Sequence, residues 1–386
     1  MTKGGVVPQL ETAAKTDDGE NRKKVVSGDF VINSRSDRKG SAGLADEDGS
    51  VSLISIVLRP QEAVHGRFIH HLLRSASFQE EFYRFGKGIV ADLWSTNYGE
   101  MRNVVLAMPP LDEQRAIAAF LEIETAKIDA LVAEQRRLMD LLQEKRQAVI
   151  SSAVTKGLNP DAPLKDTGVE WLGEVPTHWD IAPFPQVVRF QEGPGIMAAD
   201  FRDEGVPLLR VSGVQGPWAT LDGCNFLDPH DVERKWSHFR IEEGDLLLSS
   251  SASLGVISQA DASVVGAVPY TGIIRLSPNG SRLNRDFLRS LLESTLFSRQ
   301  IERLKTGATI QHFGPTHLRQ MKITVPPPEE QTQISLEIER STDQVHRLIQ
   351  ATGAAIKLLE ERRAALITAA VTGQIDVRGL AAAEAA

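Results

Sequence analysis

The chain has little of what secreted and membrane proteins need. Cys224 is the single cysteine in 386 residues, so no intrachain disulfide can form and a reducing compartment is expected. The first residues hold no apolar stretch of the kind that opens a secretory signal, and nowhere do 18 apolar residues follow one another. These absences predict a soluble, cytoplasmic protein that has no membrane span.

Motifs for catalysis and metal binding are also missing. There is no GxxxxGK[ST] phosphate loop, and no NPP[FY] stretch of the kind with which an amino-methyltransferase holds its target base. The pair His70 and His71, like His312 and His317, lacks the cysteine or carboxylate spacing of a metal site. We therefore predict no catalytic residue, no metal and no cofactor in this chain. An enzyme with an unrecognised site is the least favoured functional class.

The charge is acidic overall but basic in one region. The net charge of −8 argues against non-specific nucleic-acid binding. Between Arg275 and Lys322, however, nine basic residues face three acidic ones. A local basic face suits oriented contact with a nucleic acid. An ordinary solvated helix surface explains the same pattern equally well.

Two long stretches with helical periodicity organise the chain. The first opens after Pro109-Pro110 with Asp112 and Glu113, which favour the positive end of a helix dipole, and it meets no glycine before Gly157. Such a helix would be about 65 Å long. The stretch that opens at Pro326 repeats it at a constant shift of 326 − 109 = 217 positions. The apolar positions predicted to form the seam between the two helices are Ile117, Leu121, Ile128, Leu131, Leu138, Leu142, Ile334, Ile338, Val345, Leu348 and Leu359.

The parts between the helices repeat as well. Strands are predicted at Val25–Ser34 and Val51–Pro60, a polar loop at 35–49, and one or two helices at Phe68–Gly86. Most of this pattern recurs in the second half. We therefore predict a duplicated α/β (α+β) architecture with these divisions: a first domain (1–108), a long helix (109–157), a linker (158–168), a second domain (169–325), a second long helix (326–378) and a tail (379–386).

The repeat also predicts a topology. The stripe of the second helix needs an apolar partner, and the matching stripe in the chain belongs to the first helix, which would then run antiparallel to it as a coiled coil. Two similar domains would lie at opposite ends of this pair, related by a pseudo-twofold axis. Such an arrangement suits two half-sites on duplex DNA with an unread gap between them.

The candidates for DNA contact are donors placed in polar loops. Arg and Lys can hold phosphates, Arg can also read guanine, and Asn and Gln can read adenine. The favoured stretch, 305–312, combines a basic residue, a glycine that lets backbone approach closely and four polar side chains, and the others are polar segments beside predicted strands. The candidates are Lys305, Thr306, Thr309, Gln311 and His312; Arg210, Ser212 and Gln215; Ser250 and Ser251; and Arg35, Arg38 and Lys39.

The motifs resemble those of the DNA-specificity subunit of Type I restriction–modification systems. The helices open with PPLDEQ at 109–114 and PPPEEQ at 326–331 and close with LLQEKRQAVISSAVTKG at 141–157 and LLEERRAALITAAVTGQIDVR at 358–378. GVEWLGEVPTHWD at 168–180 is similar to the opening of a target-recognition domain, and SGDFVINSRSDRKGSAG at 27–43 to its interior. The resemblance implies a non-catalytic subunit with two recognition domains on double-stranded DNA. It also implies two methyltransferase subunits and restriction subunits as partners. S-adenosylmethionine, ATP and Mg²⁺ would belong to those partners.

One departure from the family pattern affects the first domain. Residues 1–27 align with 217–243, so the block that precedes position 217 in the second domain, with Trp171, Trp179 and VPLLRVSG, lacks a counterpart. We expect Phe30, Ile32 and Ile54 to lose core partners there and a sheet edge to be left open. Either a start upstream of Met1 or a chain that reads one half-site would account for this. A truncated or decayed copy that acts only as a coiled-coil interaction protein is the alternative function.

Overall fold

The computed structural model describes residues 6, 21–35, 38–88, 94–251, 254–304 and 313–378. The chain divides into two compact units, residues 1–138 with 351–386, and residues 139–350. Two long helices, α4 (Leu111–Lys156) and α10 (Pro328–Val371), contribute a segment to each unit. The remaining elements belong to one unit or the other, and two domains joined by helices are the result, as predicted.

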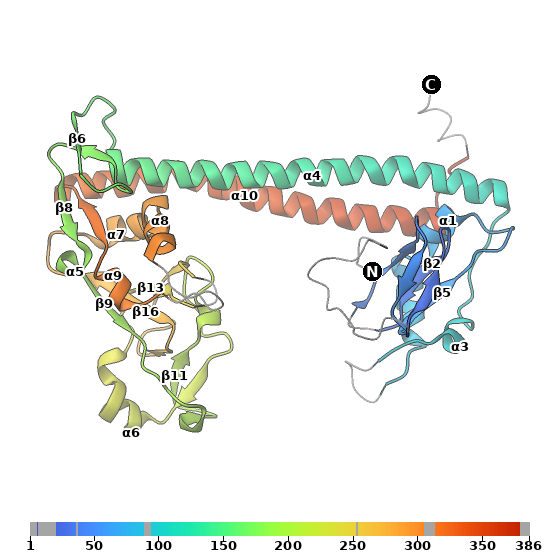
Figure 1. Cartoon of the computed structure of the whole chain (residues 1–386), viewed down its shortest axis with the longest axis horizontal. Coiled ribbons are helices and arrows are strands. Elements are labelled where there is room, and N and C mark those ends of the chain that lie inside the picture. The colour runs from blue at the N-terminus through green and yellow to red at the C-terminus, as the bar shows by residue number, and fades with distance from the viewer. Residues whose placement is uncertain are drawn as a thin grey trace. The chain divides into compact units, whose positions relative to one another are not determined.

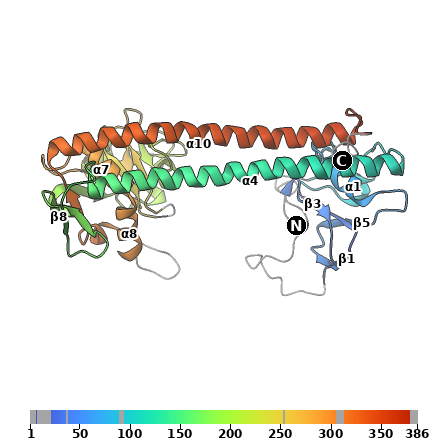
Figure 2. The same ribbon diagram turned by 90° about the horizontal axis from the view of Figure 1, so that it is seen from above.

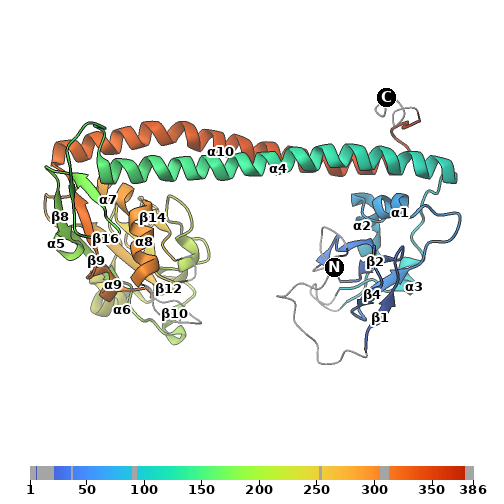
Figure 3. The ribbon, with the colours of Figure 1, turned by 45° about the horizontal axis from the view of Figure 1, so that its top comes forward.

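The first unit is a small sheet covered by helices. Strands β3, β2 and β5 pair antiparallel in that order, and β1 pairs with β4. In Figure 3, α1 lies between this sheet and α4. Its elements are β1 (Lys23–Val25), β2 (Phe30–Asn33), β3 (Ala42–Leu44), β4 (Gly49–Val51), β5 (Ser55–Leu58), α1 (Gly66–Leu72), α2 (Ala76–Arg84) and α3 (Tyr98–Met101).

The second unit is larger. One sheet has the order β14-β13-β16-β9 and is antiparallel, while a second has the order β10-β12-β11-β15, in which β11 and β15 run parallel. Two-stranded pairs β17-β8 and β6-β7 complete it (Figure 1). Its strands are β6 (Leu164–Asp166), β7 (Glu174–Pro176), β8 (Asp180–Pro183), β9 (Val188–Glu192), β10 (Phe201–Arg202), β11 (Val206–Leu209), β12 (Asn225–Leu227), β13 (Leu246–Ser249), β14 (Ile257–Gln259), β15 (Val268–Pro269), β16 (Ile273–Pro278) and β17 (Lys322–Val325).

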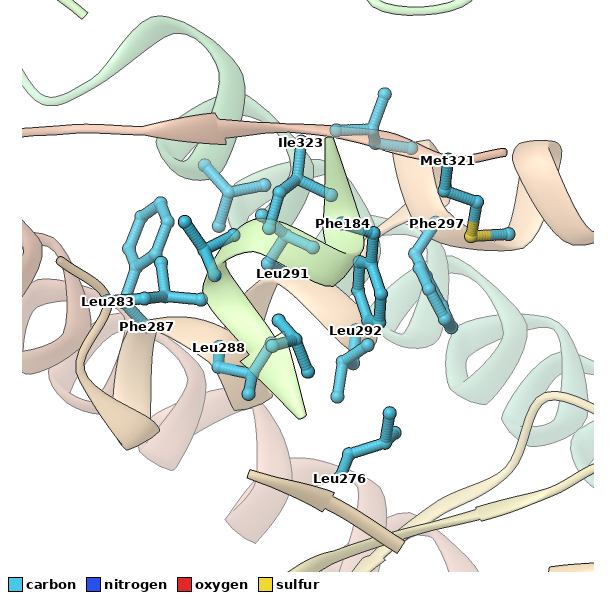
Figure 4. Packing of buried hydrophobic residues seen from close by; sticks show 14 of the residues in the cluster. Phe184, Leu276, Leu283, Phe287, Leu288, Leu291, Leu292, Phe297, Met321 and Ile323 are labelled. Atoms are coloured by element: carbon cyan, nitrogen blue, oxygen red, sulfur yellow. The ribbon is translucent and has the colours of Figure 1, made fainter. Parts of the chain in front are cut away.

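The helices of the second unit enclose its main core. Figure 4 shows this core, in which Phe184 and Phe297 stack with ring centroids 6.1 Å apart beside Leu288 and Leu292. Trp179 and Phe184 are fully buried. The helices are α5 (Phe184–Val187), α6 (Pro229–Asp231), α7 (Arg285–Leu292), α8 (Thr295–Leu304) and α9 (Pro315–Leu318), with η3 (Ala198–Asp200), η4 (Val211–Gly213), η5 (Val232–Trp236) and η6 (Ser237–Phe239).

The predicted antiparallel pairing of the long helices is confirmed inside each unit. In the first unit Arg363 of α10 forms an ion pair with Asp129 of α4 at 2.8 Å, and Arg136 of α4 with Glu360 of α10 at 3.0 Å. From the first ion pair to the second, the residue number increases along α4 and decreases along α10, so the two helices are antiparallel. In the second unit Gly157, after the end of α4, lies against Glu330 in the first turn of α10. Within each unit the two helices run side by side in the views of Figures 1 and 2.

A buried glutamine explains the motif that opens each long helix. Gln331 is fully buried: its Oε1 accepts the backbone N–H of Asn284 at 2.8 Å, and its Nε2 donates to the carbonyls of Arg282 (2.7 Å) and Pro326 (2.8 Å). Gln114 makes the same three contacts in the first unit: its Oε1 accepts the backbone N–H of His65 at 2.8 Å, and its Nε2 donates to the carbonyls of Ala63 (3.1 Å) and Pro109 (2.8 Å). Each glutamine therefore joins a globular domain to its helix through main-chain atoms.

Several predicted boundaries are wrong. Gly28, at φ +90°, turns the chain between β1 and β2, so Val25–Ser34 is not one strand. The stretch Val51–Pro60 likewise divides between β4 and β5. The polar loop at 35–49 contains β3, and the linker at 158–168 contains β6. In the two predicted strands a short turn interrupts a pattern that alternates as a strand would. In the predicted loop and linker, pairing with β2 and with β7 makes short strands of segments that have no strand pattern of their own.

The first domain was expected to lack core contacts and to leave a sheet edge open, and the structure agrees only in part. Phe30 and Ile32 are buried at 1% and 3% exposure, against expectation, because α1 and α2 cover them, whereas Ile54 is 41% exposed. Among the described residues of this unit, β5 pairs with β2 alone. Its counterpart β16 also pairs with β9. The strand without a counterpart is thus β9, and the VPLLRVSG segment forms β11 in a separate sheet.

Candidate nucleic-acid interface

Arg210 is held in place by aromatic rings. It follows β11 directly, and its guanidinium carbon lies 4.4 Å from the ring centroid of Tyr270 and 5.8 Å from that of Phe201. Its Nη1 donates to Asn225 Oδ1 at 3.1 Å. The electron-rich ring faces attract the cation, and the amide fixes its rotation. The side chain is half-buried and oriented, as a residue that reads a base with paired hydrogen bonds must be.

Two of the predicted loops converge beside Arg210. The backbone N–H of Ser250 donates to Gly272 O at 2.8 Å, and that of Tyr270 to Leu209 O at 2.9 Å. A Cβ on Gly272 would fall 2.4 Å from Ser251 Oγ and 3.5 Å from Val211. Gly272 also has φ +87°, so both the space and the backbone require glycine. The ends of β11 and β13 and the turn before β16 therefore form one surface.

The hydroxyl and amide candidates on this surface differ in access. Ser212 and Gln215 are exposed, and Gln215 Nε2 donates to Val211 O at 3.3 Å. Ser251 is half-buried, and its carbonyl accepts from Ser249 Oγ at 2.7 Å. Ser250 is fully buried, and in the described part of the chain its Oγ has no hydrogen-bond partner. In this arrangement Ser250 cannot touch DNA, which corrects its prediction as a contact residue.

The first unit carries its candidates in the matching place. The segment after β2 aligns with the segment after β13, and it holds Arg35, Arg38 and Lys39. The backbone N–H of Arg35 donates to Asn33 Oδ1 at 3.0 Å, and Lys39 Nζ lies 5.8 Å from the centre of the Tyr83 ring. Arg38 and Lys39 are exposed and Arg35 is half-buried. These donors therefore stay accessible beside an anchoring aromatic ring.

The favoured loop is not described. Lys305, Thr306, Thr309, Gln311 and His312 lie outside the described residues, so their roles stay predictions.

Much of the predicted basic face is neutralised within the second unit. Arg282 pairs with Asp180 at 3.0 Å and Arg303 with Glu170 at 2.9 Å. Arg289 pairs with Glu293 at 3.1 Å, and Arg275 lies 3.7 Å from the buried Asp245. Burial raises the pKa of Asp245, despite Arg275 nearby. Four of the nine basic residues thus lie beside a carboxylate of the same unit.

The predicted seam residues divide into three groups by burial. Ile117, Leu121 and Ile128 of α4 and Ile334, Ile338 and Val345 of α10 are buried. Leu142 and Leu359 are intermediate. Leu131, Leu138 and Leu348 are 52%, 43% and 46% exposed, so they do not form the helix–helix contact expected of them. The buried stripe of α4 continues instead through Val132, four residues after Ile128.

The sequence did not point to the aromatic supports. Phe201, Tyr270 and Asn225 come from three separate strands or turns, and only the paired sheet brings them to Arg210. Trp218, 49% exposed beside the guanidinium of Arg289, was also missed. No local pattern marks these residues, because none of them is a sequence neighbour of the arginine that it contacts. No cluster of three or more metal-ligating side chains occurs among the residues that the structure describes.

Comparison with known proteins agrees with this architecture. A family model described as the Type I restriction modification DNA specificity domain matches residues 200–357. The chain is 23% identical over 285 residues to the Type I restriction enzyme MjaVIII specificity subunit of Methanocaldococcus jannaschii, and the match covers 72% of this chain and 64% of that protein. It is 23% identical over 297 residues to the EcoKI specificity subunit of Escherichia coli K12, covering 74% and 60%. The chain thus spans less than two thirds of the length of these two relatives.

A solved structure shares the fold. A chain from work on complex assembly and conformational transition of the type I R-M system superposes with a TM-score of 0.69 at 19% identity, covering 91% of this chain and 84% of that one. At that identity the likeness concerns the fold. The matched domain, the relatives along most of the chain and the shared fold agree with the duplicated helix-opening motifs. The chain is therefore similar to Type I restriction–modification DNA specificity subunits in one matched domain, in sequence along most of its length, and in fold.

Proposed function

We propose that this chain is the non-catalytic subunit that selects the DNA site for a Type I restriction–modification assembly. The observation that carries the proposal is the duplication, in which two domains are joined to two long helices by the same buried glutamine contacts. Each domain would read one half of a split site on double-stranded DNA. Base choice would come from the loops around Arg210 and Lys39 and from the Lys305–His312 segment.

The partners would supply the chemistry. Two methyltransferase subunits would dock on the long helices, and restriction subunits would join through them. Leucines exposed on both helices support such docking, because apolar side chains on a helix surface gain from burial against a partner. They are Leu131, Leu138 and Leu141 of α4, and Leu336, Leu348 and Leu358 of α10. S-adenosylmethionine, ATP and Mg²⁺ would be bound by those partners, and the assembly would work in the cytoplasm. No helix among the described residues is long and apolar enough to cross a membrane.

The experiment combines genome mapping with binding. Methylated adenines in the host genome are mapped with and without the gene, and the split sequence lost on deletion is made as a duplex. The chain purified with its methyltransferase should bind this duplex at least about 10³-fold more tightly than a scrambled one at physiological salt. A complex that forms but binds both duplexes equally would instead identify a coiled-coil interaction protein. No methylation change and no complex would refute both functions.

A further inference from the structure

The guanidinium of Arg210 is held in place without an anion. Arg282 and Arg303 of the same unit each bind a carboxylate, at 3.0 and 2.9 Å. In the part of the chain that the structure describes, Arg210 instead has one hydrogen bond, from Nη1 to Asn225 Oδ1 at 3.1 Å, and no ion pair. A guanidinium carries five N–H groups, so most of its donors have no acceptor in that part of the chain. The charge and these donors are therefore available to another molecule.

Two aromatic rings stabilise this charge in place of a carboxylate. Arg210 is half-buried, and a charge removed from water without a counter-ion is costly. Its guanidinium carbon lies over the ring of Tyr270, 4.4 Å from the centroid, and 5.8 Å from the centroid of Phe201. The two rings also contact each other edge-on, with centroids 6.5 Å apart. Such rings attract a cation through its charge and need no hydrogen-bond acceptor, so they hold the group without using its donors as an ion pair would.

The sheet β10-β12-β11-β15 places these groups together at one of its ends. Arg210 follows β11, Asn225 opens β12 and Tyr270 follows β15. Because β12 runs antiparallel to β11 and β15 runs parallel to it, all three positions lie at the same end of the sheet. The position of the guanidinium thus depends on paired strands, which hold a recognition side chain more precisely than a loop does.

A fixed, unpaired guanidinium suits a base edge better than a phosphate. Guanine presents two neighbouring acceptors in the major groove, N7 and O6, which match two N–H groups of one guanidinium. A phosphate contact requires the charge but carries no sequence information, so it gains little from a side chain whose direction is fixed. Adenine would be rejected, because its N6 amino group is a donor and would face another donor.

We propose that Arg210 reads a guanine through N7 and O6 in the major groove, with Asn225 as its positioning residue. The inference rests on the proposed function and adds to it the base that this surface recognises. Two N–H groups of the guanidinium would donate to the two acceptors. Asn225 Oδ1 would keep the guanidinium from rotating, and the rings of Tyr270 and Phe201 would keep it from turning towards a phosphate.

The first experiment removes single acceptors from the DNA. The full-length chain, purified with its methyltransferase, is bound to duplexes of the mapped site in which one guanine at a time is replaced by 7-deazaguanine, which lacks the N7 acceptor. At one position the substitution should lower the affinity at least about fivefold. Inosine at that position removes only the minor-groove amino group, so it should change the affinity less than about twofold. Selective binding to a site without a sensitive guanine would overturn the proposal.

The second experiment assigns the sensitive guanine to Arg210. In Arg210→Ala the ratio of affinities for guanine and 7-deazaguanine at that position should fall below about twofold, because the acceptor no longer has its donor. Arg234→Ala removes an exposed arginine of the same unit that binds Asp231 at 2.8 Å, and it should keep the ratio of the parent. Arg210→Gln retains part of the side-chain stem and serves if Arg210→Ala fails to fold. Lower affinity of the variant for every duplex, with an unchanged ratio at every guanine, would identify a phosphate contact and overturn the proposal.

The third experiment tests the positioning role with Asn225→Leu. Leucine is similar in size and accepts no hydrogen bond, while the charge of Arg210 remains. The guanine ratio should therefore fall below about twofold, whereas the affinity for a scrambled duplex and its salt slope should stay those of the parent. A ratio equal to that of the parent would overturn the positioning role.

Failure of the proposed function gives a different result. The parent would then bind the mapped and the scrambled duplex equally, before any base or residue is changed, and both proposals would fall. Selective binding by the parent, with a guanine ratio that Arg210→Ala leaves unchanged, would overturn the reading by Arg210 alone.

Discussion

Removing the buried glutamine of the second unit should destabilise that unit severely. In Gln331→Ala, the N–H of Asn284 and the carbonyls of Arg282 and Pro326 each lose a partner at 2.7–2.8 Å. Gln331 itself is fully buried. An unsatisfied buried polar group costs about 1–3 kcal/mol, so three such groups at the lower part of that range cost about 3–6 kcal/mol. That is a large share of the total stability of a typical domain, about 5–15 kcal/mol.

Tryptophan fluorescence during guanidinium unfolding measures the change in the free energy of unfolding of the second unit. Four of the five tryptophans lie in the second unit, at positions 171, 179, 218 and 236, so the signal reports mainly on that unit. Gln350→Ala is the matched control, because it removes an exposed glutamine from the same helix and should change the free energy of unfolding by less than about 0.5 kcal/mol. A loss below about 1 kcal/mol in Gln331→Ala would show that the three contacts do not hold the unit to its helix.

Three further predictions concern the seam, the pH response and the contact loops. Leu121→Ala, at a fully buried position, should cost about 2–5 kcal/mol of unfolding free energy in urea, whereas Leu131→Ala, half-exposed, should cost under about 1 kcal/mol; equal costs would contradict the observed seam. The hydrogen bonds from Arg59 lower the pKa of Asp29, so the folded state gains stability from the ionised carboxylate above about pH 4 and loses it as the pH falls through the lowered value. Asp29→Asn should therefore lower the thermal midpoint at pH 7, and the difference from the parent should shrink as the pH falls below about 4; a pH-independent difference would refute this pairing. Lys305→Ala should weaken DNA binding for all sequences and flatten the salt slope, while Arg210→Ala and Gln311→Ala should each relax preference at one base pair in a binding-site selection; parent-like binding by all three would exclude these loops as the reading surface.

The long helices and the duplication could be read from the sequence because both are periodic over dozens of residues. The residues that pack between the two helices could be predicted only where the apolar residues recur at a regular spacing. After Ile128 the structure buries Val132 rather than Leu131, since a helix with 3.6 residues per turn drifts away from a strict heptad. The strand at Val25–Ser34 was misjudged because Gly28 reverses the chain within a pattern that otherwise alternates. The surroundings of Arg210 depend on Phe201, Asn225 and Tyr270, and nothing in their local sequence indicates that long-range pairing.

The hydrogen bonds of Gln114 and Gln331 affect how the sequence of such a chain can change during evolution. Gln114 and Gln331 touch only main-chain atoms, and the residues that offer those atoms differ between the halves, Ala63 and His65 in one and Arg282 and Asn284 in the other. The hydrogen bonds that attach each domain to its helix therefore do not depend on which side chains the contacted residues carry. A domain with the same backbone at its base could therefore acquire new loops, or be exchanged for an unrelated domain, while the helix that carries it stays the same. If the proposed function holds, target choice and assembly would then be inherited separately.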